Sequence, residues 1–191
     1  MKKRLYLKNK KKKQTIVNLY SPGEGRGSYK GPFTKFSFKE GKQVTGDNWD
    51  IAFRATEIIV NGGEKGKLLE DIDRTGNASM VLLSDKTLAD VISAPDNSDF
   101  KQDKSEYLVI TPGASNGWYT YSGQPYHRID PANGKIIVVK TINGNYAKLE
   151  IESYYKDKVV PDANNHYSTT KSQYFTFSYV YNPNVGDKNL K

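Results

Sequence analysis

Hydrophobic and polar residues alternate with a period of two along much of this chain. In the stretch NWDIAFR (48–54), Trp49, Ile51 and Phe53 fall on one side of an extended backbone, while Asp50 and Arg54 fall on the other. Successive side chains of a β-strand point to opposite faces, so this alternation predicts half-buried strands. Stretches of the same kind are TIVNLY (15–20), FTKFSF (33–38), TEIIV (56–60), ASMVLL (78–83), EYLVIT (106–111), GWYTYS (117–122), KIIVVKTI (135–142), NYAKLEIESYY (145–155) and YFTFSYVY (174–181).

Asn143-Gly144 separates two of the longest strand patterns. Asn and Gly tolerate the positive φ that both central residues of a type I′ turn require. The sequence therefore predicts a two-residue hairpin at this point, with its two arms in the middle of the sheet.

Evidence for helices is thin. Residues 84–95 (SDKTLADVISAP) have N-cap candidates, apolar residues at helical spacing and a terminating proline, so they fit either a short helix or a loop. Residues 95–105 and 156–172 are polar and indicate long loops, which in compact domains are functional or mobile. We expect an all-β, mainly antiparallel single domain over residues 15–183, with a polar C-terminal tail at 184–191.

The formal net charge of +8 comes entirely from the N-terminus. Residues 1–13 contain eight Lys or Arg and no acidic residue, whereas the remaining residues contain 21 basic and 21 acidic groups. A run of like charges repels itself and is usually disordered, so residues 1–14 are expected to be a solvated basic tail. Because the folded part is neutral and no nucleic-acid-binding motif is visible, we expect no nucleic-acid partner.

Targeting features are also absent from this sequence. The basic stretch is followed only by short apolar runs, and a secretory signal needs an apolar region of about 7–15 residues. No apolar run approaches the roughly 20 residues that span a bilayer, so no transmembrane segment is expected. The chain has no cysteine, which excludes disulfides, thiol nucleophiles and an N-terminal lipid-bearing Cys.

Catalytic and metal-ion motifs do not stand out. No G-x-S-x-G motif occurs, and no motif places a serine beside His127 or His166, the only histidines in the chain. These two histidines are 39 positions apart, and no clustered zinc ligands or calcium-binding loop are present. We therefore expect a protein that is not an enzyme; a hydrolase would need a carboxylate or Ser within hydrogen-bond reach of one of the histidines.

The surroundings of His127 allow a different kind of site. His127 lies in a turn-rich stretch with Tyr121, Tyr126 and Arg128, and His166 lies beside Tyr167 in the other long loop. A haem iron needs only one or two axial donors, while aromatic rings can pack the macrocycle and Arg can pair with its propionates. Both histidines can equally be exposed loop residues without a ligand.

Four sequence blocks together resemble the HmuY-like haem-binding proteins, which are haemophore-type lipoproteins. The blocks are DNWDIAFR (47–54), GWYTYS (117–122), VVKTINGNYAKLEIESYY (138–155) and FTFSYVY (175–181), in that order. The resemblance covers roughly residues 15–181. It implies an all-β fold with ligand-gripping loops, binding of haem b, transfer of haem to an outer-membrane TonB-dependent receptor, and a location at the cell surface as an outer-membrane lipoprotein or in the secreted fraction.

The resemblance also implies positions for the axial ligands, and this chain departs from them. One family position, just after the strand matching GWYTYS, falls on Gly123, which cannot bind iron. The other falls in the loop at 95–103, which has neither His nor Met, and Met80 is expected in the core. The hypothesis is then that His127 and His166 are the axial candidates, with a tyrosine as the alternative to His166, and that Tyr121, Tyr126 and Arg128 line the pocket.

The alternative is a non-catalytic module with the HmuY fold that has lost haem ligation. Such a module would bind another small molecule or a protein partner through the loops at 95–105 and 120–133.

Overall fold

A computed structural model describes residues 11–25, 29–113 and 116–191. The largest sheet has five antiparallel strands in the order β1-β11-β10-β9-β6. Its strands are β1 (Lys13–Tyr20), β6 (Ser79–Leu83), β9 (Ile136–Lys140), β10 (Tyr146–Tyr155) and β11 (Ser172–Asn182). β10 is the central strand, with β11 and β9 on either side, so both arms of the predicted hairpin lie inside the sheet.

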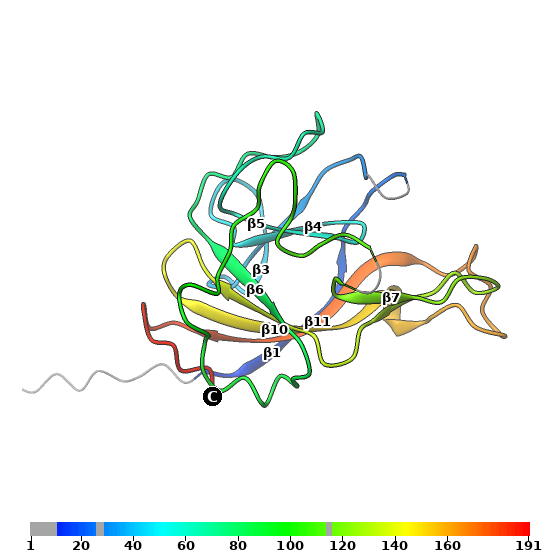
Figure 1. Cartoon of the computed structure of the whole chain (residues 1–191). Helices are drawn as coiled ribbons and strands as arrows, with labels where there is room; N and C mark the ends of the chain where they lie inside the picture. The colour runs from blue at the N-terminus through cyan, green and yellow to red at the C-terminus, as the bar shows by residue number, and fades with distance from the viewer. Residues whose placement is uncertain (1–10, 26–28, 114–115) are drawn as a thin grey trace, which may run out of the picture.

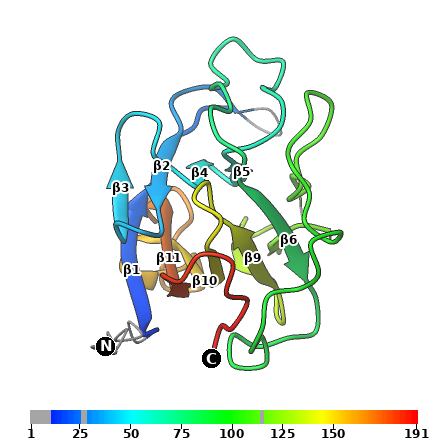
Figure 2. The ribbon, with the colours of Figure 1, turned by 90° about the vertical axis from the view of Figure 1, so that its left-hand side faces the viewer.

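A four-stranded antiparallel sheet lies across one face of the large sheet (Figures 1 and 2). Its order is β3-β2-β4-β5, with β2 (Thr34–Ser37), β3 (Lys42–Val44), β4 (Ile51–Arg54) and β5 (Glu57–Val60). A third, two-stranded sheet pairs β7 (Tyr119–Tyr121) with β8 (Ile129–Pro131). The only helical turn in the described ranges is the 3₁₀ turn η1 (Lys156–Lys158). The all-β, mainly antiparallel fold class is confirmed.

Aromatic side chains fill the space between the two larger sheets. Phe53 of β4 lies 4.7 Å from Phe175 and 5.7 Å from Phe177 of β11, and Phe36 of β2 lies 5.3 Å from Phe177, all measured between ring centroids. These rings are fully buried. Stacked, tilted and edge-on pairs of this kind add to the free energy gained from burying apolar area. Met80 also lies in this core, as predicted.

The prediction of half-buried strands is wrong for the central strands, because loops cover their outer faces. All four residues of β4 are buried, including Arg54, and so is Asp50 just before the strand. The spacing predicted that Trp49 shares a face with Ile51. Instead, Trp49 packs with Ala52 and Ile59 in a separate cluster.

The outer face of the large sheet carries a second apolar cluster. Leu88, Val91 and Phe100 from the loop at 84–100 pack over β9 and the start of β10, together with Leu190 near the C-terminus. Lys148 of β10 is buried beneath this loop and donates to the carbonyls of Leu88 and Val91. Residues 84–95 therefore form a covering loop and not a helix.

Two further local expectations differ from the structure. Residues 106–111 form turns and an isolated bridge at Tyr107, not a strand. The connection between β9 and β10 is a hairpin, but Thr141 N–H donates to the Asn145 carbonyl and Gly144 N–H donates to the Thr141 carbonyl. Positive φ falls on Gly144 alone (+76°), so the loop has three residues and is not the predicted type I′ turn.

The β7–β8 hairpin and the segment that follows η1 project together from one end of the molecule (Figure 1). We call these residues, 119–131 and 159–171, the extension. The predicted basic tail lies mostly at residues 1–10, outside the described ranges, and Lys13 already belongs to β1. No helix in the described residues is long and apolar enough to cross a membrane.

Candidate functional site

The extension is anchored in the core by the aromatic residues of GWYTYS and of β10. Trp118 is buried against Tyr154 and Phe175, and its Nε1–H donates to the Thr56 carbonyl at 2.8 Å. On the other arm of the hairpin, Ile129 N–H donates to the Tyr155 hydroxyl at 2.9 Å. Burial raises the pKa of the Tyr155 phenol, so this group stays a neutral hydroxyl. The base of the extension is therefore fixed to both sheets.

A compact turn connects the two strands of the hairpin. His127 N–H donates to the Gly123 carbonyl at 2.7 Å, and Ser122 N–H donates to the Arg128 carbonyl at 2.9 Å. Gly123 and His127 are thus the two ends of one hydrogen-bonded turn. His127 has a φ of +50°, in the left-handed region where His, like Asn and Asp, is enriched among residues other than glycine.

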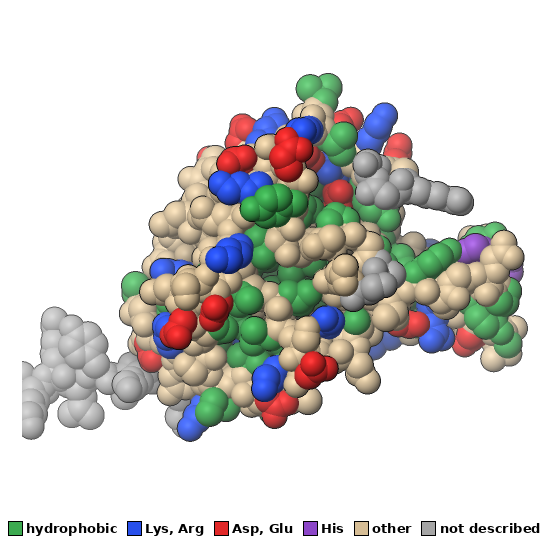
Figure 3. Space-filling view, viewed as in Figure 1, with side chains coloured by type: hydrophobic (Ala, Val, Ile, Leu, Met, Phe, Trp, Pro, Cys, Tyr) green, Lys and Arg blue, Asp and Glu red, His purple; other side chains and the backbone are tan. Residues whose placement is uncertain are grey.

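The turn places His127 against tyrosine rings from both parts of the extension. The Tyr121 hydroxyl is hydrogen-bonded to Nδ1 of His127. The Tyr167 ring lies 4.8 Å from the imidazole of His127 and 4.5 Å from that of His166, between centroids. Two histidines that are 39 positions apart in the sequence therefore contact the same ring. We call Tyr121, His127, His166 and Tyr167 the tip cluster. The histidine surface is visible at the end of the extension in Figure 3.

The segment that carries His166 is held by its own turns. Asp162 accepts backbone N–H bonds from Asn164 and Asn165, and these bonds lower the pKa of its carboxyl. The His166 carbonyl accepts bonds from Thr169 and Thr170. Nδ1 of His166 lies 2.7 Å from Ser168 Oγ and accepts the Ser168 N–H at 3.3 Å. The second imidazole is therefore oriented by residues of its own loop. Ser168 lies within hydrogen-bond reach of His166, so the expectation that no serine lies beside a histidine is wrong.

The other predicted pocket residues lie near the tip cluster but outside it. Tyr126 is 38% exposed and makes no ring contact with the cluster among the described residues. Arg128 Nε is paired with Asp130 at 2.6 Å. Arg128 can therefore meet an anionic ligand group only through its terminal nitrogens or by leaving Asp130.

The loop that corresponds to the second family ligand position lies away from the extension. Phe100 in this loop contacts Tyr146 at the start of β10, with ring centroids 5.8 Å apart. The extension is attached at Tyr155, at the other end of this ten-residue strand. Ten residues of strand span roughly 30 Å, so residues 95–100 cannot supply a donor at the tip.

A clustered metal site is not present in the described ranges, where no group of three or more His, Cys, Asp or Glu side chains could hold an ion. Any metal held at the tip must bring most of its own ligands, as the iron of a porphyrin does.

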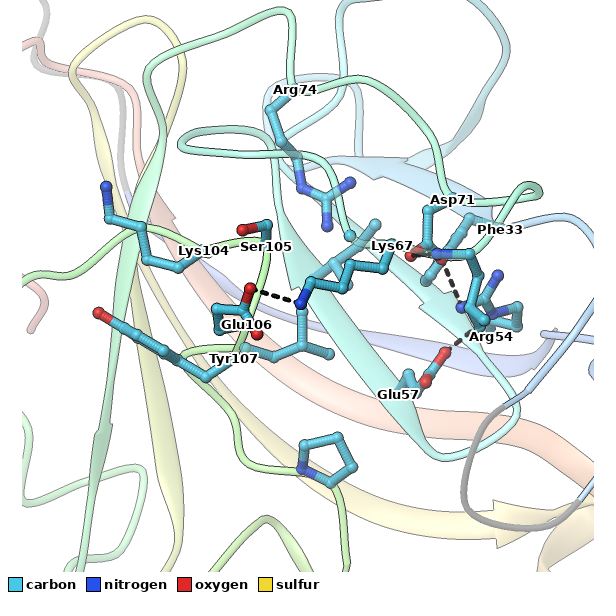
Figure 4. Close-up of a pocket in the computed structure, with 15 residues that line it drawn as sticks. Phe33, Arg54, Glu57, Lys67, Asp71, Arg74, Lys104, Ser105, Glu106 and Tyr107 are labelled. Atoms are coloured by element: carbon cyan, nitrogen blue, oxygen red, sulfur yellow. Dashed lines mark hydrogen bonds and ion pairs between the residues drawn. The ribbon is translucent and has the colours of Figure 1, made fainter.

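A pocket of about 240 Å³ lies beside β4 and β5 (Figure 4), and none of the residues that line it belongs to the tip cluster. Arg54 crosses its floor and pairs with Glu57 at 2.8 Å and Asp71 at 2.7 Å, while the Phe33 ring stacks on its guanidinium at 4.0 Å. Lys67 and Glu106 form an ion pair at 2.5 Å across the mouth. Most charged side chains of the pocket are therefore paired within the protein. The Arg54–Asp71 pair connects the loop at 64–74 to β4 of the small sheet.

Sequence reasoning missed two features of these regions. The pattern placed Arg54 on a solvated strand face, because it could not show that residues 64–74 cover that face. It noted Tyr167 only as a neighbour of His166, although this ring joins the two histidines. The signal in the sequence that could have indicated this contact was that each of the two histidines lies next to a tyrosine.

Comparison with known proteins places these observations in a family. A family model described as HmuY protein matches residues 30–179, which include the whole tip cluster. A candidate lipoprotein from Bacteroides fragilis is 15% identical with a TM-score of 0.47, over 80% of this chain and 83% of that one. The apo HmuY analog of Tannerella forsythia is 17% identical with a TM-score of 0.45, over 91% of this chain and 96% of that one. No curated protein matches the chain.

Proposed function

The chain belongs to the HmuY family, and from this premise we propose that it is a non-catalytic binding protein that captures haem b at the tip of its extension. One observation supports this most directly. His127 and His166, which come from separate segments, both contact the ring of Tyr167 at an exposed end of the molecule.

The chemistry of the tip suits an iron porphyrin. Both imidazoles are hydrogen-bonded at Nδ1, and in the described part of the chain neither Nε2 has a hydrogen-bond partner. Where Nδ1 donates its proton, as Nδ1 of His127 can to the Tyr121 hydroxyl, the other nitrogen is free to bind a metal. Nδ1 of His166 accepts the Ser168 N–H, so Nε2 of His166 must lose its proton before it can bind iron. Tyr121, Tyr126 and Tyr167 are 50%, 38% and 45% exposed, so they offer aromatic surface to a flat ligand.

The turn geometry gives a reason why the substitution at Gly123 can be compensated. Gly123 and His127 close the same turn through one hydrogen bond, so the His127 backbone lies within one turn of the position on which the family ligand falls. His127 is therefore the first axial candidate, and His166 in the facing loop is the second. Arg128 would pair with a propionate through its terminal nitrogens.

The family suggests what happens to the captured haem. We propose that the protein works at the cell surface, as an outer-membrane lipoprotein or in secreted form, and passes haem to an outer-membrane TonB-dependent receptor. Aromatic and imidazole groups at an exposed tip suit such a transfer, because a receptor can reach the ligand without the fold opening.

A second candidate function keeps the fold but not haem. Nδ1 of His166 already accepts the Ser168 N–H, and Arg128 is already paired with Asp130, so neither side chain is free for haem without a rearrangement. These interactions favour a module that binds another small molecule or a protein through the extension. This candidate predicts that haem does not bind.

A hemin titration of the purified full chain tests the proposal. We expect a shifted Soret band that saturates with hemin, and a weaker or altered band in both the His127→Ala and the His166→Ala variants. Tyr107→Ala is the matched control, because Tyr107 is an exposed tyrosine of the pocket loop and not of the extension. If the wild-type protein leaves the spectrum of free hemin unchanged, haem binding is excluded for this protein.

A further inference from the structure

The pocket beside β4 and β5 contains a buried cation with an unused hydrogen-bond donor. Arg74 lines this pocket, and its side chain is only 1% exposed. The Nε–H of Arg74 has no hydrogen-bond partner among the described residues. Figure 4 shows the Arg74 guanidinium pointing into the pocket, toward Lys67.

We infer that this pocket is a further binding site, that it takes a small carboxylate with an apolar body, and that Arg74 holds the carboxylate. The inference goes beyond the proposed function, because none of the lining residues belongs to the tip cluster.

The partners of Arg74 compensate its burial only in part. Nη1 donates to the Ile72 carbonyl at 2.6 Å, and Nη2 donates to the Asp103 carboxylate at 3.3 Å. Asp103 also accepts the N–H groups of Val60 and Val109, so its charge is shared among three donors. Burial lowers the pKa of the Arg74 guanidinium, and Asp103 only partly opposes this shift. A ligand oxygen on Nε would therefore remove the cost of an unpaired buried donor.

The acidic residues that line the pocket are already paired. Glu57 and Asp71 both bind Arg54, and Glu106 binds Lys67. A cationic ligand would thus find no free carboxylate among the described lining residues. A ligand carboxylate would instead meet a guanidinium with an unused donor, and hydrogen bonds between two charged groups are the strong ones.

The mouth of the pocket can open at low cost. The side chains of Lys67 and Glu106, which pair across it, are 66% and 67% exposed. An exposed ion pair contributes little free energy, so an incoming carboxylate can replace Glu106 as the partner of Lys67. The ligand would then lie between the mouth and Arg74 and be bound by two cations.

The remaining lining residues set the size and polarity of the ligand. Ile59, Leu68, Leu108 and Pro112 supply apolar surface for its body. The pocket volume of about 240 Å³ is below the range of about 300–1,000 Å³ that is typical of drug-sized ligands. The pocket therefore suits a monocarboxylate with one small ring or a short branched chain.

Benzoate is the probe for this site, and benzamide, which has a similar shape and no charge, is its control. Each is titrated into the isotope-labelled full chain and followed in amide NMR spectra. We expect benzoate to cause saturable shifts at amides of the pocket, such as those of Lys67 and Ser105, and none at the tip cluster. Benzamide should bind at least about five-fold more weakly, because it lacks the charge that strengthens the hydrogen bonds.

Three variants test the residues. Arg74→Lys keeps a positive charge beside Asp103 but has no Nε–H, and it should weaken benzoate binding about ten-fold. Lys67→Ala should weaken it about two- to five-fold, as expected for an exposed charge. Lys65→Ala should have no effect and is the matched control, because Lys65 is an exposed lysine of the same loop that pairs with Asp73 and does not line the pocket.

Unchanged thermal unfolding of each variant by circular dichroism shows that the fold is kept, and if Arg74→Lys unfolds early, Lys67→Ala against Lys65→Ala decides. The inference is wrong if benzoate shifts no amide of the pocket, if benzamide binds equally well, or if folded Arg74→Lys keeps the wild-type affinity. A hemin titration of the same samples is read separately, since Arg74→Lys should bind hemin as wild type does. Failure to bind hemin counts against the proposed function alone.

Discussion

At the scale of single residues, Asp50 shows how a buried carboxylate joins the two main sheets. It is 2% exposed and accepts the N–H of Phe38 at 2.8 Å and that of Ile142 at 3.1 Å. Phe38 follows β2 of the small sheet, and Ile142 follows β9 of the large sheet. One side chain therefore satisfies a donor in each sheet, and no cation pairs with it in the described residues.

The Asp50→Asn variant should lose stability and change its response to pH. The amide offers one oxygen to two N–H donors, and a buried donor left unpaired costs about 1–3 kcal/mol. Burial raises the pKa of the Asp50 carboxyl above its value in the unfolded chain, although the two N–H bonds oppose the shift. The contribution of this group to the free energy of unfolding is therefore complete below the unfolded pKa and falls as pH rises through the folded one.

Urea unfolding of wild type and Asp50→Asn at several pH values checks both effects. The difference between the two proteins in the slope of unfolding free energy against pH isolates Asp50 from Glu57 and Asp103, whose pKa values burial also raises. Asp47→Asn, at an exposed position of the same loop, is the control. Equal slopes for wild type and Asp50→Asn would contradict the argument.

At the scale of elements, the β9–β10 hairpin depends on one glycine. Gly144 has a φ of +76°, and a Cβ there would meet only Val185 at an ordinary contact distance of 3.5 Å. The cost of Gly144→Ala should thus come from the left-handed backbone and amount to about 1–2 kcal/mol.

Asn143→Ala is the matched control in the same turn. A type I′ turn would require positive φ at both residues, whereas the observed turn requires it only at Gly144. We expect Asn143→Ala to change the free energy of unfolding by less than about 0.5 kcal/mol in the same denaturant titrations. Comparable losses in both variants would instead indicate the type I′ turn.

At the scale of the whole molecule, the C-terminal residues complete the outer face of the large sheet. Leu190 is fully buried, its N–H donates to the Ile92 carbonyl, and the Lys188 carbonyl accepts the Ala94 N–H. These contacts close the second apolar cluster over β9 and β10. The end of the chain and the loop at 84–100 therefore support each other.

Leu190→Ala should destabilise the protein by about 2–4 kcal/mol, because it removes buried methyl groups and leaves a cavity. Val185→Ala, at a 71% exposed position of the same segment, should be nearly neutral. Thermal and urea unfolding measure both variants. A neutral result for Leu190→Ala would show that the second cluster contributes little to stability.

The sequence by itself determined the features that depend on neighbouring residues. Period-two alternation predicted the strands except β3 and β8, because side-chain direction in a strand follows from backbone geometry alone. It also predicted a strand at 106–111 that does not form. Asn143-Gly144 marked the central hairpin, and four sequence blocks indicated the family. The alternation could not distinguish a solvated face from one covered by a loop, so Asp50 and Arg54 were misplaced.

Only the tertiary structure decided which distant residues meet. His127 and His166 lie on separate segments, and they share the Tyr167 ring because Trp118, Tyr154 and Tyr155 fix the base of the extension. In the same way, the burial of Leu190 depends on a loop nearly one hundred residues earlier in the chain. Such contacts arise from packing across the sheets, and no local pattern encodes them.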